Sequence, residues 1–473
     1  MKYCCTSAIK SLALIVLALV LSGDIHAQAS SLSPYSRFGI GTILSQGTAT
    51  HHGLGGSNTG LVDHFSINLE NPASYSYLYN TTFNVGARGT MLKLSDENES
   101  ENLNFASVNQ FSFAFKKQGG KFALVLGLVP FTTTGYSITN NQTLENIGDV
   151  AFTYDGEGGI NKSNIGAAYR FDIKTDKGLF DKNLIPDSGF VRHNVSIGAN
   201  INYYFGSLQQ SRRVLFAEPD FLHTRISSAT AINDLNLSVG MLSLFNLTNK
   251  FNGSTRINGV DVMLGVTYEL GSDFNTRFEE LTETVLFFNA TEVVVDTALW
   301  VQETDGVISI PEKIAFGGGL RITNKNDRTF KLVGDYKTQD WSKFSGQFGT
   351  VSDENLLSTA TSISAGFEYT PKPLGKATKG GERTTYRLGI RQSASYLVLA
   401  NRQITEQAVS AGFSLPMINS QTFPPSKMNF GIEFGNRGTT EENLIEESFV
   451  NFYVGFSLTP HVINKWFVQR KYD

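Results

Sequence analysis

The chain has very little cysteine. Its 473 residues include only two, Cys4 and Cys5. Both lie in an N-terminal segment that we expect to be removed, so the remaining chain has no thiol for disulfides, thiolate metal sites or a cysteine nucleophile. A chain without cysteine also suits passage through an oxidising compartment while it is still unfolded.

Long apolar runs and strong charge are missing as well. No run of about 20 apolar residues occurs, which excludes a bundle of transmembrane helices. Charged residues make up 17% of the chain, and the formal net charge is −4. This mild negative balance provides no basic surface for a nucleic-acid partner. Aromatic residues, in contrast, reach 12%, and there are 45 glycines, as expected of a β-rich chain whose apolar residues are spread by alternation.

The first 29 residues have the organisation of a secretory signal peptide. Lys2 and Lys10 flank the positively charged start, residues 12–21 form an apolar core, and small residues follow up to Ala29. The apolar core is too short to span a bilayer by itself. We therefore expect residues 1–29 to be a signal peptide, cleaved after Ala27 or Ala29.

The rest of the chain divides into two patterns. Residues 30–80 are rich in glycine, serine and asparagine and show no clear period, which favours tight turns over long regular elements. From Thr81 onwards apolar and polar residues alternate, for example over 195–203 and 450–458. A period of two is typical of strands with one apolar face. These patterns predict an N-terminal plug over 30–80 and a β-barrel over 81–459.

A soluble β-sandwich would also alternate, with its apolar face turned inward. The membrane is favoured because many runs approach the 9–11 residues that a tilted strand needs to cross a bilayer. The polar faces carry glycine, serine and asparagine, as expected of a wet or plugged lumen rather than a solvent-facing surface. The predicted fold class is all-β: a transmembrane antiparallel β-barrel with a plug, or hatch, in its lumen.

The alternating runs amount to about fourteen strands, and an even number places both ends of the barrel on the periplasmic side. Residues 460–473 are accordingly predicted to form a periplasmic tail. Residues 275–306 are ambiguous, because the apolar runs 285–288 and 293–295 could form another hairpin. Their uneven spacing favours a long extracellular loop.

Several motifs occur in an order similar to that of the FadL/TodX family of outer-membrane transporters for long-chain fatty acids and other hydrophobic compounds. Asn71-Pro72-Ala73, between plug and barrel, resembles the NPA element of that family. The series continues with 126–131 (LGLVPF), 310–317 (IPEKIAFG), 335–336 (DY), 341–342 (WS) and 364–369 (SAGFEY). The opening 33–41 (SPYSRFGIG) and the tail 466–471 (WFVQRK) resemble outer-membrane proteins of the Bacteroidetes type.

The resemblance implies passive uptake through the outer membrane of a Gram-negative bacterium. A hydrophobic molecule such as a fatty acid would be captured outside, pass the plug, and leave through the wall into outer-membrane lipid or into the periplasm. Members of the superfamily in such bacteria also serve protein secretion, so a barrel of the same fold that works with secretion-machinery proteins (type IX-like) stays open. A general porin is the third alternative.

Apolar side chains of the plug are candidate ligand contacts, because a path for hydrophobic molecules needs an apolar pocket with a few polar groups. An equally simple interpretation is that they only pack the plug against the wall, since apolar side chains usually pack. The four candidates are Phe38, Leu54, Phe65 and Leu69.

Arginines on the lumen-facing side of the strands could bind the carboxylate of a ligand. They could also pair with luminal Glu269, Glu368 and Glu433, because charges inside a barrel usually pair. The four candidates are Arg88, Arg321, Arg387 and Arg391.

The NPA element has a second expected role. Pro72 lacks an N–H group and has a fixed φ, so it suits a chain that turns from the plug into the wall and would be out of place in a central strand. We interpret Asn71, Pro72 and Ala73 as a hinge near the periplasmic end of the first strand.

Enzymatic sites are not indicated. His51, His52, His64 and Asp63 do not have the spacing of a metal-ligand set, so we predict no metal and no other cofactor. Residues 53–56 lack the strand and helix that flank a phosphate loop, and no nucleophile elbow occurs. Trp341 is interpreted as an interface-belt aromatic or as wall packing.

Overall fold

The structure is a computed structural model. It describes residues 33–459 except 98, 146, 176–190, 219, 253–254, 289–290, 325, 327, 347–355, 373–379 and 418–425. The predicted signal peptide and the predicted periplasmic tail therefore lie outside the described residues.

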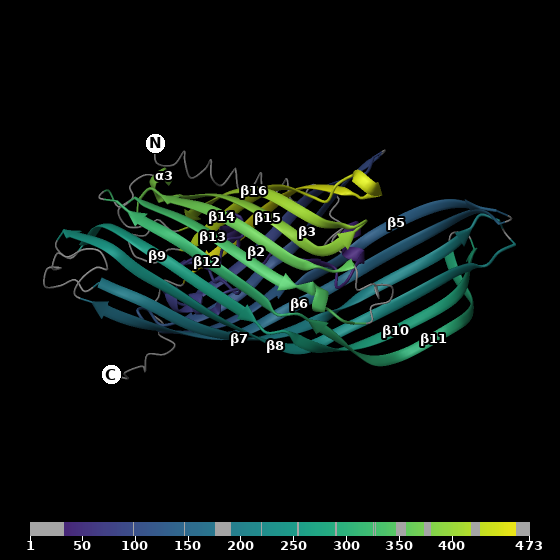
Figure 1. Cartoon of the computed structure of the whole chain (residues 1–473), viewed down its shortest axis with the longest axis horizontal. Coiled ribbons are helices and arrows are strands. Elements are labelled where there is room, and N and C mark those ends of the chain that lie inside the picture. The colour runs from purple at the N-terminus through teal and green to yellow at the C-terminus, as the bar shows by residue number, and fades with distance from the viewer. Residues whose placement is uncertain are drawn as a thin grey trace, which may run out of the picture.

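Antiparallel strands close into a barrel, in which the last strand pairs with the first (Figure 1). The alternation found in the sequence explains this architecture, because each wall strand turns one face to the lumen and the other to the outside. The first half of the wall comprises β2 (Thr82–Ser95), β3 (Ser100–Lys116), β4 (Phe122–Pro130), β6 (Gly148–Thr175), β7 (Val191–Phe216), β8 (His223–Asn252) and β9 (Thr255–Glu269). The second half comprises β12 (Lys313–Thr323), β13 (Thr329–Asp340), β14 (Thr359–Thr370), β15 (Thr385–Leu399), β16 (Arg402–Pro416), β17 (Lys427–Arg437) and β18 (Glu446–Leu458).

The closed ring has 14 strands, as the sequence predicted. The whole sheet has 18 segments, because three strands continue past short interruptions and the plug adds one. β5 (Thr132–Leu144) continues β4, β10 (Ser272–Phe288) continues β9, and β11 (Thr291–Ile310) leads into β12. Pro311 lies at the interruption between β11 and β12, where a residue without an N–H group cannot support a ladder.

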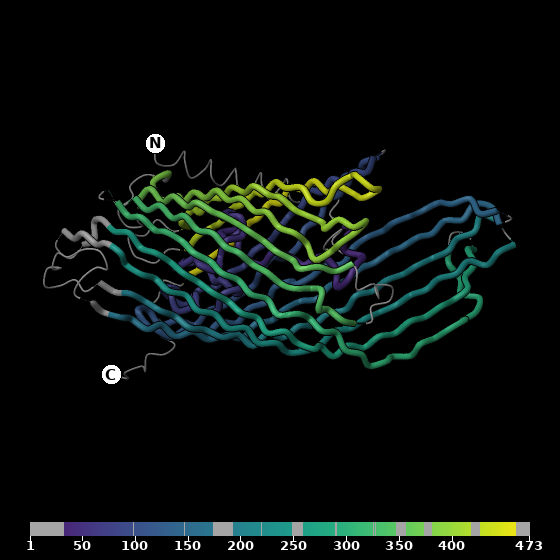
Figure 2. The backbone as a smooth tube through the Cα atoms, in the orientation of Figure 1, coloured from purple at the N-terminus to yellow at the C-terminus, as the bar shows by residue number. Residues whose placement is uncertain are grey.

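The expectation that 275–306 form a long loop is wrong. These residues lie in β10 and β11, which pair with each other from Ser272↔Ile310 to Phe288↔Thr291. Three register shifts interrupt this pairing, which explains why the apolar runs appeared unevenly spaced. The hairpin does not widen the ring, because β9 pairs directly with β12. It extends the wall on one side instead, beyond the end of the ring (Figure 2).

The outer face of the ring is apolar. On β8, for example, Leu235, Leu237, Val239 and Met241 are exposed in alternation, as expected of a lipid-facing strand. Among the described residues no helix is long and apolar enough to cross a membrane.

Residues 33–80, which we call the plug, lie inside the ring (Figure 1). Their short elements are η1 (Pro34–Arg37), β1 (Thr42–Ile43), α2 (Ala49–His52) and η2 (Pro72–Tyr77). α2 packs on β16, β17 and β18, η2 packs on β6, β7 and β8, and β1 pairs with β5. The three remaining described helices are short: η3 (Trp341–Lys343), α3 (Gly380–Arg383) and η5 (Glu441–Asn443), the last in the final hairpin.

Candidate functional site

Glycines on the inner face of the wall hold the plug at close range. A Cβ atom on Gly389 would lie 2.0 Å from the amide nitrogen of Gly55, and one on Gly317 would lie 2.2 Å from that of Gly60. On Gly265 it would lie 2.0 Å from the carbonyl oxygen of Thr59. Any side chain at these three positions would therefore have to push the plug backbone away.

Carboxylates fix the centre of the plug electrostatically. The Asp335 carboxylate accepts hydrogen bonds from the amide groups of Asn58 and Thr59 at 2.6 and 2.7 Å. Glu70 of the plug forms ion pairs with Lys313, at 2.9 Å, and with Lys337. Burial alone would raise the pKa of the Glu70 carboxyl, but the two ammonium groups outweigh it and hold the pKa well below its usual range.

The predicted hinge is closely packed. The Asn71 side chain accepts a hydrogen bond from the amide of Ala73 at 3.1 Å and donates one to the Thr59 carbonyl at 2.7 Å. All three hinge residues are buried, and a Cβ atom on wall residue Gly198 would lie 2.5 Å from Pro72. The segment is thus an anchored turn in this conformation, and its movement stays a prediction.

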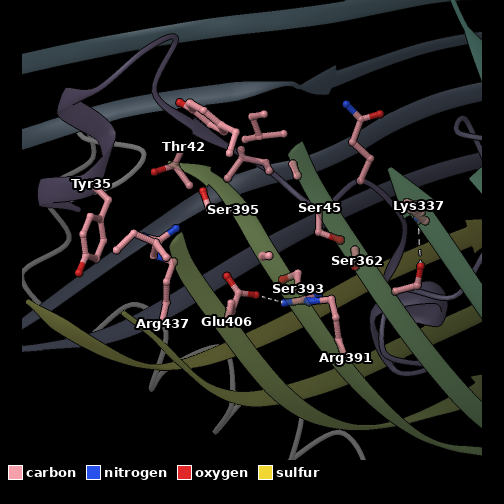
Figure 3. A pocket seen from close by; sticks show the side chains of 18 of the residues that line it. Tyr35, Thr42, Ser45, Lys337, Ser362, Arg391, Ser393, Ser395, Glu406 and Arg437 are labelled. Atoms are coloured by element: carbon pink, nitrogen blue, oxygen red, sulfur yellow. Dashed lines mark hydrogen bonds and ion pairs between the residues drawn. The ribbon is translucent and has the colours of Figure 1, made fainter. Parts of the chain in front are cut away.

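A cavity of about 290 Å³ separates the plug from the wall. Plug residues, mainly 41–46, form one side of it, and inward side chains of β2 and of β12 to β18 form the other. Figure 3 shows Arg391 and Glu406 joined on the cavity wall, with Ser45 of the plug facing them and Tyr35 and Arg437 at one end. Its volume is close to the lower end of the range for small-molecule pockets.

One part of the cavity lining is apolar. Its aromatic and aliphatic side chains belong to one buried cluster of the barrel. The Trp341 ring stacks on Tyr396 with 4.8 Å between ring centroids. The side chains in question are Tyr35, Phe131, Trp341, Tyr396, Leu397 and Ile404.

The other part of the lining is charged and contains one more cation than anion. The anions Glu70, Glu406, Glu433 and Glu447 face the cations Arg88, Lys313, Lys337, Arg391 and Arg437. Arg391 forms ion pairs with Glu406 at 2.6 Å and with Glu433 at 2.8 Å, and Arg437 pairs with Glu447. These pairs leave a single guanidinium without a carboxylate partner in the lining.

That guanidinium belongs to Arg88. Within the part of the chain that the structure describes, Arg88 forms no ion pair, and its Nε is buried without a hydrogen-bond partner. The strand register places Arg88 opposite Tyr453, whose ring stacks on His52 with 4.0 Å between centroids. Burial, followed by the charges of Arg391 and Arg88, lowers the pKa of His52 well below its ordinary value, so the imidazole is neutral and does not add to the charge.

Polar atoms on both sides of the cavity lack protein partners. They are buried Arg391 Nη1, Glu433 Oε2, Trp341 Nε1, Gln46 Oε1 and Thr42 Oγ1. Buried polar groups are nearly always hydrogen-bonded, so these atoms retain unused hydrogen-bonding capacity beside the cavity. The cavity therefore combines an apolar side, a polar rim and a guanidinium, that of Arg88, which forms no ion pair among the described residues.

The four predicted arginines fall into two groups, those that line the cavity and those that do not. Arg88 and Arg391 line the cavity together. Arg387 pairs with Glu368 at 2.8 Å, and Arg321 pairs with Asp261 at 2.7 Å. The last two lie outside the cavity lining, so their proposed role in ligand binding has no support from its geometry.

The four predicted apolar contacts of the plug lie outside the cavity lining too. Leu54 packs on Gly366, Leu69 packs on Gly127, and Phe38 packs against the buried cluster around Trp341. The Phe65 ring receives the Lys427 ammonium 3.7 Å from its centroid. All four side chains pack in the present conformation, and whether any of them meets a passing ligand stays a prediction.

The inward position of Trp341 was not predicted from the sequence. This tryptophan was interpreted as an interface-belt or wall aromatic, but it is 1% exposed and lines the cavity. The η3 turn after β13 carries it inward, where the Asp340 carboxylate accepts a hydrogen bond from the amide of Ser342 at 3.3 Å. The pair Asp340–Ser342 is a capping signal that could have indicated this turn.

Within the described residues no three histidine, cysteine, aspartate or glutamate side chains lie close enough together to hold a metal ion. The buried histidines of α2 instead serve packing. His51 Nδ1 accepts a hydrogen bond from the Thr48 amide at 3.1 Å.

The barrel with its luminal segment has the fold of the FadL/TodX-type barrels. It is similar to the toluene transporter TbuX of Ralstonia pickettii, with 13% identity and a TM-score of 0.53. It is also similar to the toluene transporter TodX of Pseudomonas putida (15%, 0.50) and to a FadL homologue of Pseudomonas aeruginosa (9%, 0.51). Each alignment covers 88% of this chain and 98% of the other.

The family model named BamG matches residues 8–183 and 185–473. The chain therefore belongs to the BamG family. No curated protein matches its sequence.

Proposed function

We propose that the protein admits hydrophobic compounds passively through the outer membrane, and that it favours amphipathic molecules with an acidic head, such as long-chain fatty acids. The observation that carries this proposal is the cavity between plug and wall. It has an apolar side around Trp341 and Tyr396 and a charged side on which Arg88 lacks a counter-ion.

The two sides match the two ends of such a molecule. Burying an alkyl chain against the aromatic side contributes about 0.8 kcal/mol for each methylene group removed from water. An acidic head beside Arg88 would give it an ion-pair partner, and a guanidinium can bind a carboxylate through two hydrogen bonds. The fold supports the same function, since toluene transporters share it.

The proposal predicts that Arg88 selects for the acidic head. Purified protein should bind a long-chain fatty acid saturably, and Arg88→Gln should weaken that binding about tenfold or more, because a hydrogen bond to a charged group is worth about 1.5–3 kcal/mol. Binding of the matching fatty alcohol should change little. Isothermal titration in detergent that does not compete for the cavity measures both.

Arg277→Gln is the matched control, because Arg277 is 63% exposed and lies on β10, away from the cavity. It should bind the acid like the unmodified protein. Absence of saturable binding for every apolar ligand tried would contradict the proposal and favour a role with secretion-machinery proteins. Equal losses for acid and alcohol in Arg88→Gln would show that Arg88 only supports the fold.

A further inference from the structure

Beyond the closed ring, one side of the wall continues as an open sheet, in which β5, the paired parts of β6, β7 and β8, and the hairpin of β10 and β11 lie side by side (Figure 1). β10 pairs with β8 on one side, from Thr276↔Ile232 to Val285↔His223, and with β11 on the other. Apart from the isolated bridge Ser309↔Ser345, no strand register among the described residues involves the other side of β11. With respect to those residues, its edge over 291–308 is open.

This edge lies in water rather than in lipid. The outward side chains of β10 include Asp273, Arg277 and Glu279, all exposed, and charged side chains are costly on a lipid-facing surface. The lipid-facing row of the neighbouring strand β8 ends at Leu235, before the residues that pair with β10 begin. The hairpin therefore stands outside the membrane, on the side opposite to the start of β2 and the end of β18.

The open edge is apolar as well as exposed. On β11 the side chains of Val293, Val295, Leu299 and Trp300 are all about half exposed, with Trp300 at 57%. Natural proteins protect open edges with charges, bulges or very short strands. Charges and bulges occur on this edge too. Protection against aggregation does not explain why valine, leucine and tryptophan side chains are exposed beside them.

The charge of the β10–β11 hairpin indicates which kind of partner can bind this edge. Residues 272–310 contain eight acidic residues and one basic residue: Asp273, Glu279, Glu280, Glu283, Glu292, Asp296, Glu303 and Asp305, with Arg277. Glu283, Glu292 and Glu303 form ion pairs with arginines, and the other five carboxylates form none among the described residues. Edge-to-edge pairing with a second copy would bring acidic residues of β11 against one another, which is unfavourable. Anionic lipid would be repelled in the same way.

We propose that β11 binds an extended, cationic segment of a partner protein outside the membrane, which adds a strand to the sheet. Main-chain hydrogen bonds to the open edge supply affinity, and the exposed apolar side chains and the carboxylates select alternating apolar and basic residues. Asp296 and Glu303 lie four and three residues from Trp300 on the same strand, so basic residues spaced along an added strand would meet their charges. Glu303 would then exchange its exposed ion pair with Arg277 for one with the partner.

The opposite edge of the same sheet provides a comparison for β11. β5 forms this opposite edge, and beyond the two residues that pair with β1 no described strand covers that edge. Over 137–144 its side chains are almost all uncharged and polar, SITNNQTL. The same backbone exposure, with only two apolar and no acidic side chains, should therefore attract no cationic strand.

The test uses the full-length protein in lipid nanodiscs and short synthetic peptides of alternating lysine and valine. Fluorescence anisotropy should show saturable binding that weakens with added salt, and hydrogen exchange should show protection of the amides in 293–305 but not of those in β5. A peptide of alternating glutamate and valine, and a lysine–valine peptide interrupted by proline, should not bind.

The double variant Asp296→Lys with Glu303→Lys should weaken peptide binding at least about tenfold, since it reverses both charges at the centre of the edge. Glu99→Lys with Glu101→Lys, in the exposed β2–β3 hairpin, is the control and should bind normally. Failure of the lysine–valine peptide to bind, protection of β5 instead of β11, or dimerisation of the protein through β11 would each overturn the proposal. Uptake of fatty acid does not enter this experiment, so its outcome is independent of the proposed transport function.

Discussion

Arg88 is the residue on which the proposed ligand chemistry depends. The period-two pattern placed it correctly on the lumen face together with Arg391. The pattern could not show which arginines are already neutralised. Glu433, for example, is 42 positions from Arg391 in the sequence, and only the strand register brings the two together. A charge without a partner can be recognised only after every other pairing is known.

The buried histidines of the plug predict a dependence on pH. Burial lowers the pKa of His51 and of His64 from 6.5 to about 4. A displaced plug would take up protons at a higher pH than the packed plug does. Packing should therefore weaken as the pH falls from 6.5 to about 4, by about 1.4 kcal/mol per pH unit and histidine. Above pH 6.5 it should stay constant.

Hydrogen exchange of amides 49–60, corrected for the intrinsic rates, measures this effect at about pH 7 and about pH 5. Protection should be lower at the acidic pH. His51→Gln removes one of the titrating groups and should reduce the change. Equal protection at both pH values would show that these histidines do not couple to plug packing.

At the scale of elements, the sequence predicted the wall strands well because lipid on one side and lumen on the other enforce strict alternation. β8 is typical, with Leu235, Leu237, Val239 and Met241 on its outer face. The prediction failed at 275–306, since β11 is exposed along most of its length and lipid imposes no alternation on it. Three register shifts between β10 and β11 disturb the pattern further.

The glycines of the wall were recognised as a mark of a plugged lumen, but not as the surface on which the plug rests. Gly389→Ala should displace the plug, because the added Cβ would lie 2.0 Å from the backbone nitrogen of Gly55. In a planar bilayer the unmodified protein should show little steady ion conductance, and Gly389→Ala should conduct measurably more.

Gly89→Ala is the matched control for this substitution. It also replaces a glycine in a wall strand by alanine, but nothing lies within 4 Å of the added Cβ. Its conductance should remain low. High steady conductance of the unmodified protein would indicate a general porin and contradict the account of a filled lumen.

At the scale of the whole molecule, the ring of 14 strands could be predicted from the count of alternating runs and from the even number that both ends require. The position of the cavity could not. It lies where plug residues 41–46 meet strands that are far apart in the sequence. Trp341, the tryptophan that lines the cavity, is directed inward by a single short turn after β13.

Fluorescence of Trp341 tests the central claim, that an acidic hydrophobic molecule occupies this cavity. With Trp300 and Trp466 replaced by phenylalanine, Trp341 is the only tryptophan of the chain. Titration with a bromine-labelled long-chain fatty acid should then quench its emission saturably, and Arg88→Gln should move the midpoint about tenfold higher. Unchanged emission of Trp341 while the fatty acid binds, or quenching that never saturates, would contradict the account.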